Sequence, residues 1–271
     1  MTERIAFIGG GNMASAIIGG LIRQGTPAQM IDVVEPFTEA RVALQKQHGV
    51  LAQPQAGPFL EAAALVVWAV KPQMFRQAAA AVCPHTALAL HLSVAAGIRT
   101  DSIAQWLGSE RVVRAMPNTP ALIGRGMTAL FARATVTAAD RARVDAVIAT
   151  TGELLWLTAE EQLDAVTALS GSGPAYMFYF MEAMRAAGVE MGLPAEQAYQ
   201  LAVATFIGAG ELARASSEPP EVLRQRVTSP GGTTHAAISK MMQTDVGGQF
   251  IQAMHAARSR ATEMGQEFGA A

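Results

Sequence analysis

The chain has 271 residues, a length that allows a large core and predicts two domains. Its formal net charge is −2, with 20 basic and 22 acidic side chains, which argues against nucleic acid or an anionic membrane as a partner. The single cysteine, Cys83, excludes a disulfide within the chain and favours a reducing, cytoplasmic compartment, and we expect it to be a small buried apolar residue.

Apolar runs alternate with helical patterns through the first half of the chain. The run ALVVWAV at 64–70 is continuous, which is typical of a strand buried on both faces of a parallel sheet. Strands that alternate with helices over short links predict an α/β, Rossmann-type doubly wound sheet. Strands are expected at 4–9, 30–35, just after Gly49 and Val50, 64–70, 86–94, 112–118, 127–132 and 153–157, and helices at 12–24, 38–49, 73–82, 103–108 and 137–151.

The pattern changes near residue 158, and no strand is expected after Glu160. We therefore expect a dinucleotide-binding domain over residues 1–157 and an all-α substrate-binding domain over residues 158–271. The stretch YMFYFMEAM at 176–184 is apolar on more than one side of a helix, so the helical domain is expected to pair with a second copy. Helices are expected at 174–191, 194–214, 221–226, 232–243 and 246–267.

A hydrophobic share of 51% raises the question of a membrane span. The longest apolar stretch, residues 78–98, is interrupted by Pro84, His85 and His91, so it lacks the roughly 20 apolar residues of a spanning helix. We expect a helix end, a turn and a buried strand there, and no membrane partner.

Residues 5–20, IAFIGGGNMASAIIGG, admit two interpretations. A secretory signal is suggested by Arg4 before an apolar run and by ASA at 14–16, but the uninterrupted run ends at Ile8, short of the roughly 7 residues that a signal requires. The alternative is a strand that turns through glycine into a helix and holds the phosphates of a dinucleotide. The sheet pattern favours this second interpretation.

The dinucleotide fingerprint GxGxxG/A fits Gly9, Gly11 and Ala14. Gly9 permits the tight turn, Gly11 lets the backbone approach the pyrophosphate, and small Ala14 lets helix and strand pack closely. A lone match is weak evidence, but this one follows a predicted strand, opens a helix and begins the alternating pattern. We therefore expect a dinucleotide site rather than a purely structural turn.

Glu35 ends the second predicted strand, where an acidic side chain accepts hydrogen bonds from the adenosine ribose. A carboxylate there should repel a 2′-phosphate, which taken alone favours NADH over NADPH. A solvated loop carboxylate beside Pro36 is the alternative interpretation, and Arg41 is near enough in sequence to meet a phosphate.

Two further stretches follow the predicted strands at the edge where open α/β sheets bind ligands, AVKPQ at 69–73 and SVAAG at 93–97. Their small residues would let a nicotinamide ring come close. Pro72 after Lys71 suggests a positional role for this lysine rather than a catalytic one.

Two loops in the helical half are unusual for a plain helical bundle. TALSGSGPAYMF at 167–178 and VTSPGGTTHAAI at 227–238 both carry glycines directly before a predicted helix. Exposed backbone N–H groups and a helix N-terminus favour an anion, and a substrate carboxylate is the natural ligand. Two ordinary capped turns are the alternative on physical grounds.

These motifs together resemble pyrroline-5-carboxylate reductases, over essentially the whole chain. The resemblance is carried by FIGGGNMASAI, AVKPQ, SVAAG, MPNTP at 116–120, DAVTALSGSGPAY and VTSPGGTTHAAI. It implies a Rossmann domain, a helical domain that interlocks with a partner in a dimer, and in many members a decamer. It also implies hydride transfer from NADPH or NADH to the C=N bond of 1-pyrroline-5-carboxylate, which gives L-proline.

The resemblance also implies roles for particular residues. The substrate carboxylate would be held by Ser229 and by the backbone N–H groups of Gly232, Thr233 and Thr234. The Thr234 hydroxyl would reach the ring nitrogen as the catalytic hydrogen bond, and Glu160 matches a family position near the site. Family members commonly carry a small polar residue in place of Glu35, which leaves the choice between NADH and NADPH open. The implied cofactor residues are Ile8, Gly9, Gly10, Gly11, Asn12, Met13, Ala14, Glu35, Ala69, Val70, Lys71, Pro72, Ala95, Ala96 and Gly97.

Two other functions would share parts of this pattern. β-Hydroxyacid dehydrogenases also share the G-S-G pattern, but they place a catalytic lysine where this chain has Met177. A non-catalytic nucleotide sensor would not need the SPGGTT loop. His235 and Tyr176 are more simply explained by helix packing than by acid catalysis. We expect no metal, because the histidines lack ligand spacing.

Overall fold

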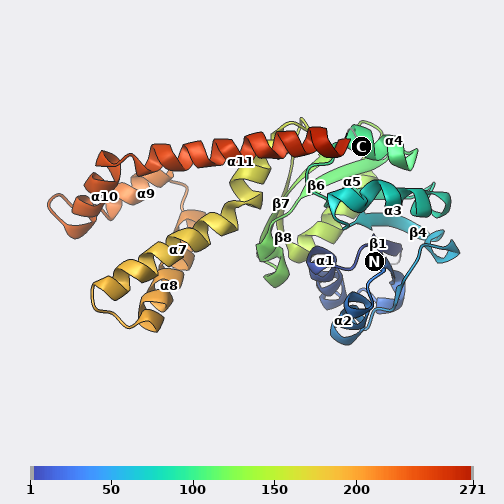
Figure 1. Cartoon of the computed structure of the whole chain (residues 1–271), viewed down its shortest axis with the longest axis horizontal. Helices are drawn as coiled ribbons and strands as arrows, with labels where there is room; N and C mark the ends of the chain where they lie inside the picture. The colour runs from blue at the N-terminus through green and yellow to red at the C-terminus, as the bar shows by residue number, and fades with distance from the viewer. Residues whose placement is uncertain (1–2, 270–271) are drawn as a thin grey trace. The chain divides into compact units, whose positions relative to one another are not determined.

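A computed structural model describes residues 3–269 and divides the chain into two compact units (Figure 1). One unit runs to Ser172 and includes the chain again from Ala257, and the other is Gly173–Ala256. Helix α11 (Val246–Gly269) therefore contributes to both. These units are defined by which residues pack together in space. The domain boundary at residue 158 is based on the change in sequence composition and stays a prediction.

The first unit is built on an eight-stranded sheet with the order β3-β2-β1-β4-β5-β6-β7-β8. Strands β1 to β6 are parallel, which confirms the predicted Rossmann-type sheet. The strands are β1 (Arg4–Ile8), β2 (Ile31–Val34), β3 (Ala52–Gln53), β4 (Ala63–Trp68), β5 (Leu90–Ser93), β6 (Val112–Met116), β7 (Gly126–Ala132) and β8 (Gly152–Trp156).

The last two strands depart from a fully parallel sheet. Strand β7 is antiparallel to β6, and β8 is parallel to β7. Only residues 117–125 join β6 to β7, and they contain a single 3-10 turn, Thr119–Ile123. A parallel connection needs a crossover of about a dozen residues or more, usually helical, so this short link returns the chain in the opposite direction.

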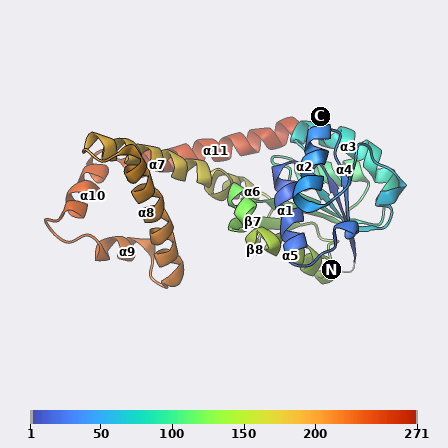
Figure 2. The same ribbon diagram turned by 90° about the horizontal axis from the view of Figure 1, so that it is seen from below.

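Helices cover both faces of the sheet (Figures 1 and 2). Side chains alternate along each strand, so Leu65 and Val67 pack on one face while Val66 and Trp68 pack on the other. The first face is covered by α1 (Asn12–Arg23), α2 (Thr38–His48) and α5 (Ala138–Ile148), and the second by α3 (Phe75–Val82), α4 (Thr100–Leu107) and the end of α11.

The second unit is helical, as predicted for this region. Gly188 of α7 lies against Ala198 of α8, and Tyr176 and Phe180 set their rings edge-on to Phe250 at 5.5 and 5.6 Å. Tyr176 therefore has a packing contact. The helices are α7 (Gly173–Glu190), α8 (Ala195–Ala215), α9 (Pro220–Arg226), α10 (Thr233–Gln243) and the first part of α11.

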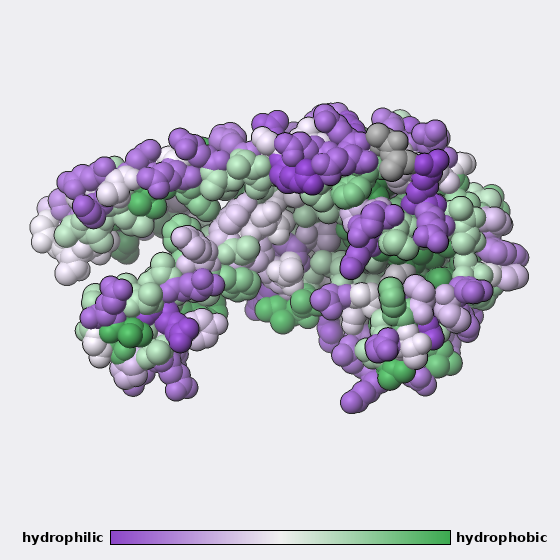
Figure 3. Space-filling view, viewed as in Figure 1, coloured by the Kyte–Doolittle hydropathy of each residue, from purple (hydrophilic) through white to green (hydrophobic). Residues whose placement is uncertain are grey.

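Many large apolar side chains of this second unit lie at its surface (Figure 3). Exposure of this kind over several helices marks an interaction surface. Among residues 3–269, no helix combines the length and the apolar content needed to cross a bilayer. The exposed side chains include Phe178, Tyr179, Leu201, Ile207, Leu212, Met242 and Ile251.

His91 on β5 makes the stability of the first unit depend on pH. It is buried, its Nδ1 accepts a hydrogen bond from Trp68 Nε1 at 3.2 Å, and burial together with Arg111 lowers its pKa to about 4. Between pH 6.5 and about 4 the unfolded chain binds the extra proton, so the free energy of unfolding falls as pH falls through this window. The loss is on the order of 3 kcal/mol.

Urea unfolding of the unaltered protein and of His91→Gln at pH 7.5 and pH 4.5 tests this expectation. The variant should lose less stability between the two pH values, because it lacks the group that charges on unfolding. An equal loss in both proteins would assign the pH dependence to other groups.

Candidate cofactor and substrate sites

The carboxyl ends of four strands meet at one edge of the sheet. Ile8 lies opposite both Val34 and Trp68, and Trp68 lies opposite Ser93. The ladder continues past the strands, with Gly9 N–H donating to Val34 O at 2.8 Å and Ala69 N–H to Ile8 O at 2.8 Å. The glycine turn, Glu35 and the loops after β4 and β5 are thereby brought together where open α/β sheets bind ligands.

The glycine turn after β1 has a separate requirement at each position. Gly9 has φ of +95°, and a Cβ there would lie 2.6 Å from Ala69 O. Ala14 is fully buried between helix and sheet, whereas Gly11 is exposed and a Cβ there would meet no protein atom within 4 Å. Gly9 is therefore required by the fold, and Gly11 leaves open space beside the start of α1.

This difference predicts opposite results for two alanine variants. Gly9→Ala should destabilise the protein, because it forces a left-handed residue against a carbonyl. Gly11→Ala should leave the unfolding free energy within about 0.5 kcal/mol and weaken dinucleotide binding at least roughly 10-fold, because its methyl group would occupy the space of the pyrophosphate.

Chemical denaturation and titration of nicotinamide fluorescence measure the two effects separately. Undiminished cofactor affinity in Gly11→Ala would place the pyrophosphate elsewhere.

Glu35 lies at the same edge, but its carboxylate is turned into the protein. The residue is 5% exposed, and both oxygens accept backbone hydrogen bonds, Oε2 from Gly10 N–H at 2.7 Å and Oε1 from Phe37 N–H at 2.8 Å. It is therefore not a solvated loop carboxylate. Its assignment as a ribose ligand stays a prediction.

The loops after β4 and β5 complete this edge. Ala69 and Val70 are half-buried, and Lys71 is exposed before the short turn Pro72–Met74. Ala95 is buried and Ala96 is partly exposed. The assignment of these small side chains to the nicotinamide stays a prediction.

Gly97 ends the second of these loops in a left-handed conformation, with φ of +77°. A Cβ there would lie 3.1 Å from Met264 Cβ and 3.3 Å from the Phe268 ring, both on α11. Glycine is therefore required by conformation and by packing, and the end of α11 supports the loop from behind.

Asn118, in the MPNTP motif after β6, links three segments of the first unit, although the sequence assigned it no role. Its amide nitrogen donates to both the carbonyl and the hydroxyl oxygen of Ser170 at 3.3 Å, and its oxygen accepts from Met127 N–H at 2.9 Å. Ser170 lies in a π-helical turn, Thr167–Gly171, of a kind that is frequent at functional sites. The sequence signal that could have pointed to Asn118 is its position between Pro117 and Pro120 in a loop after a predicted strand.

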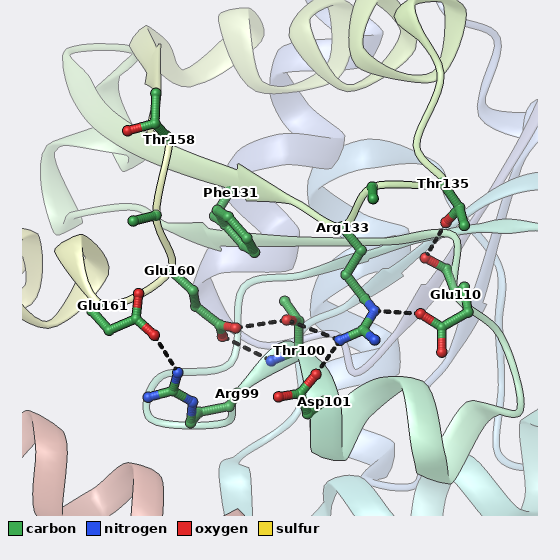
Figure 4. A pocket seen from close by; sticks show the side chains of 12 residues that line it. Arg99, Thr100, Asp101, Glu110, Phe131, Arg133, Thr135, Thr158, Glu160 and Glu161 are labelled. Atoms are coloured by element: carbon green, nitrogen blue, oxygen red, sulfur yellow. Dashed lines mark hydrogen bonds and ion pairs between the residues drawn. The ribbon is translucent and has the colours of Figure 1, made fainter.

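Glu160 lines a cavity of about 380 Å³ between α4, β7 and the segment after β8 (Figure 4). Its Oε1 accepts from Thr100 N–H at 2.8 Å and from Arg114 at 2.9 Å, and its Oε2 accepts from the Thr100 hydroxyl at 2.6 Å. These bonds hold the start of α4 and favour a positioning role over proton transfer.

The other charges around this cavity are also paired. Arg99 bonds Glu161 at 2.7 Å, and Arg133 bonds both Glu110 and Asp101 (Figure 4). A ligand would have to displace one of these partners, so the cavity offers no charge of its own to a substrate.

The predicted substrate loop lies in the second unit. Gly231 has φ of +75°, Gly232 N–H donates to Ser229 O at 3.0 Å, and α10 begins at Thr233. The N–H of Gly232 is thus used within the turn, whereas those of Thr233 and Thr234 lie in the first helical turn and have no intrahelical acceptor. An anion is favoured there, although the individual contacts to substrate stay predictions.

Comparison with known proteins gives consistent similarities along the chain. A family model described as pyrroline-5-carboxylate reductase dimerisation matches residues 160–264, and one described as NADP oxidoreductase coenzyme F420-dependent matches residues 4–97. The chain is 43% identical to a pyrroline-5-carboxylate reductase of Pseudomonas aeruginosa, over 99% of each chain. It is 40% identical to one of Haemophilus influenzae, over 96% of this chain and 97% of the other.

Solved structures agree with the sequence relatives. A pyrroline-5-carboxylate reductase from Coxiella burnetii matches with a TM-score of 0.90 at 37% identity, over 97% of this chain and 99% of that one. A Plasmodium falciparum pyrroline carboxylate reductase with NADP bound matches with a TM-score of 0.87 at 26% identity, over 97% and 98%. More distant matches, such as a reductive aminase at 17% identity, share the fold alone.

Proposed function

Because this chain belongs to the pyrroline-5-carboxylate reductase family, we propose roles for its own residues in the family reaction. The protein is an oxidoreductase that uses NAD(P)H to reduce the C=N bond of 1-pyrroline-5-carboxylate to L-proline, the last step of proline synthesis. The strongest support is 43% identity to a pyrroline-5-carboxylate reductase over 99% of the chain.

The described residues fit a dinucleotide. Gly11 is open, the first turn of α1 has unpaired N–H groups and no side-chain cap, and small residues surround the loops after β4 and β5. We assign the pyrophosphate to the turn Gly9–Ala14, and the nicotinamide to Ala69–Pro72 and Ala95–Gly97. When bound, the cofactor supplies the hydride.

The substrate loop then has two tasks. The N–H groups of Thr233 and Thr234, with Ser229, hold the substrate carboxylate at the start of α10. The Thr234 hydroxyl donates a hydrogen bond to the ring nitrogen, where negative charge would otherwise develop as the hydride arrives. This hydrogen bond draws electron density from the C=N bond and makes its carbon more electrophilic, while the loop holds that carbon at a reactive distance.

Assembly and location follow the same reasoning. The chain forms a homo-oligomer, since residues 160–264 match a dimerisation family. We propose a dimer built on the exposed apolar side chains of α7 and α8, with a decamer as the larger assembly. A cytoplasmic location is supported by the single cysteine, and we propose no metal, nucleic acid or membrane partner.

Assays of the purified protein with 1-pyrroline-5-carboxylate and each of NADPH and NADH test the function. Nicotinamide absorbance should fall as L-proline, identified chemically, accumulates. A 3-hydroxy acid with NADP⁺ serves as the control substrate for the dehydrogenase alternative and should give no turnover. Absence of proline with both reduced cofactors would refute the assignment.

A further inference from the structure

The buried carboxylate of Glu35 is the starting observation. A charged group that is 5% exposed must find strong partners inside the protein, and Glu35 finds two backbone N–H groups, those of Gly10 and Phe37. Its own N–H donates to Gln53 O at 2.9 Å, which fixes its backbone between β2 and β3. Both ends of Glu35 are therefore used to hold neighbouring backbone.

The glycine turn rests directly on this side chain. A Cβ at Gly10 would lie 3.2 Å from Glu35 Cγ and 2.7 Å from Leu44 Cδ1. Gly10 thus packs on the stem of Glu35 while its N–H is held by the carboxylate. This arrangement fixes the peptide between Gly9 and Gly11, whose open side faces the pyrophosphate position.

The positively charged side chain of Arg41 lies at the same end of β2. Arg41 is half-buried on α2, and its guanidinium donates to Glu35 O at 2.9 Å, Pro36 O at 2.7 Å and Thr38 Oγ1 at 3.0 Å. All three acceptors are neutral, and among residues 3–269 no carboxylate forms an ion pair with Arg41. The three hydrogen bonds therefore fix the orientation of the Arg41 guanidinium, and no carboxylate of the described residues neutralises its positive charge.

We propose that Glu35 is a positioning residue for the glycine turn, and that Arg41 with Thr38 takes the adenosine 2′-phosphate, so that this chain prefers NADPH to NADH. The inference rests on the proposed cofactor edge and reverses the preference that Glu35 suggests in the sequence alone. A carboxylate saturated by backbone N–H groups and shielded from solvent is a poor acceptor for ribose hydroxyls. An oriented guanidinium beside the α2 N-terminus suits a phosphate.

Binding measured without substrate tests the proposal independently of catalysis. We would titrate NADPH and NADH by nicotinamide fluorescence, and 2′,5′-ADP and 5′-AMP by calorimetry. Arg41→Ala should weaken NADPH and 2′,5′-ADP roughly 10- to 100-fold and change NADH less than about twofold. Lys46→Ala, which removes an exposed cation from the same helix, should change none of them.

Glu35→Gln separates positioning from selection. Its amide retains one acceptor but sets a donor against a backbone N–H, so affinity for NADPH and NADH should fall by the same factor. A rise in the NADPH-to-NADH affinity ratio would make Glu35 the selector and overturn the proposal, as would an equal loss of both cofactors in Arg41→Ala. If Glu35→Gln does not fold, Arg41→Gln and Thr38→Val still test the phosphate contact through the same ratio.

The inference and the proposed function fail separately. Proline formation with unselective cofactor binding would refute the phosphate contact alone. Selective NADPH binding without proline formation would refute the reaction and leave the contact intact.

Discussion

Replacement of Thr234 by alanine is expected to lower kcat about 100-fold while the Kd for NADPH changes less than about twofold. Thr234 is half-buried in the first turn of α10, and its hydroxyl makes no hydrogen bond to any other described residue. It is therefore available to donate to a substrate. Because the proposed contact would matter most as the imine nitrogen gains electron density, its loss should appear in turnover rather than in cofactor binding.

Two further variants sharpen this measurement. Thr234→Ser keeps the hydroxyl and should recover most of the rate. Thr244→Ala removes an exposed hydroxyl that bonds Lys240 O at 3.0 Å near the end of the same helix, and it should leave kcat unchanged. A Thr234→Ala enzyme that turns over at the normal rate would remove this residue from the mechanism.

The second large effect concerns Glu160, whose loss should destabilise the protein by about 3–5 kcal/mol. The side chains of Arg114 and Glu160 are only 5% and 7% exposed, and their atoms lie 2.9 Å apart. Glu160→Ala leaves the Arg114 guanidinium buried without this partner, and the Asp164 carboxylate is farther away, at 3.9 Å. It also frees the N–H and hydroxyl of Thr100 at the start of α4.

The neighbouring residue provides a matched control. Glu161 also pairs with an arginine, Arg99 at 2.7 Å, but the two side chains are 68% and 41% exposed. Exposed pairs contribute little, so Glu161→Ala should leave the urea midpoint close to that of the unaltered protein. Both variants are compared at one protein concentration, because stability of an oligomer depends on it. Equal midpoints for the two variants would show that the buried network is not needed for stability.

Much of the fold could be predicted from hydrophobic patterning. The continuous run at 64–70 became β4, and the glycine turn fell between β1 and α1 as the fingerprint requires. The reversal of β7 could not be read in this way, because an apolar run carries no direction and only the short link at 117–125 decides it. Helix α6 (Gln162–Val166) could not be predicted either, because five residues are too few to show a helical period.

The candidate site, like the fold, could be predicted only in part from the sequence. Gly9, Gly11 and the small residues at 95–97 are predictable, since a backbone turn leaves a signature in adjacent residues. The inward turn of Glu35 and the contacts of Glu160 depend on atoms brought from other elements, Gly10 in one case and Arg114 in the other. The strand end predicted a ribose contact for Glu35, and the family resemblance alone put Glu160 near the site, whereas packing gives each carboxylate internal partners.

The support of Gly97 by Met264 and Phe268 has a consequence for biosynthesis. The loop at 93–97 is translated early, yet the side chains that pack behind it are translated far later, on α11. During translation this loop remains without its backing until residues 264–268 have left the ribosome. The loop to which we assign the nicotinamide is therefore completed later in translation than the glycine turn.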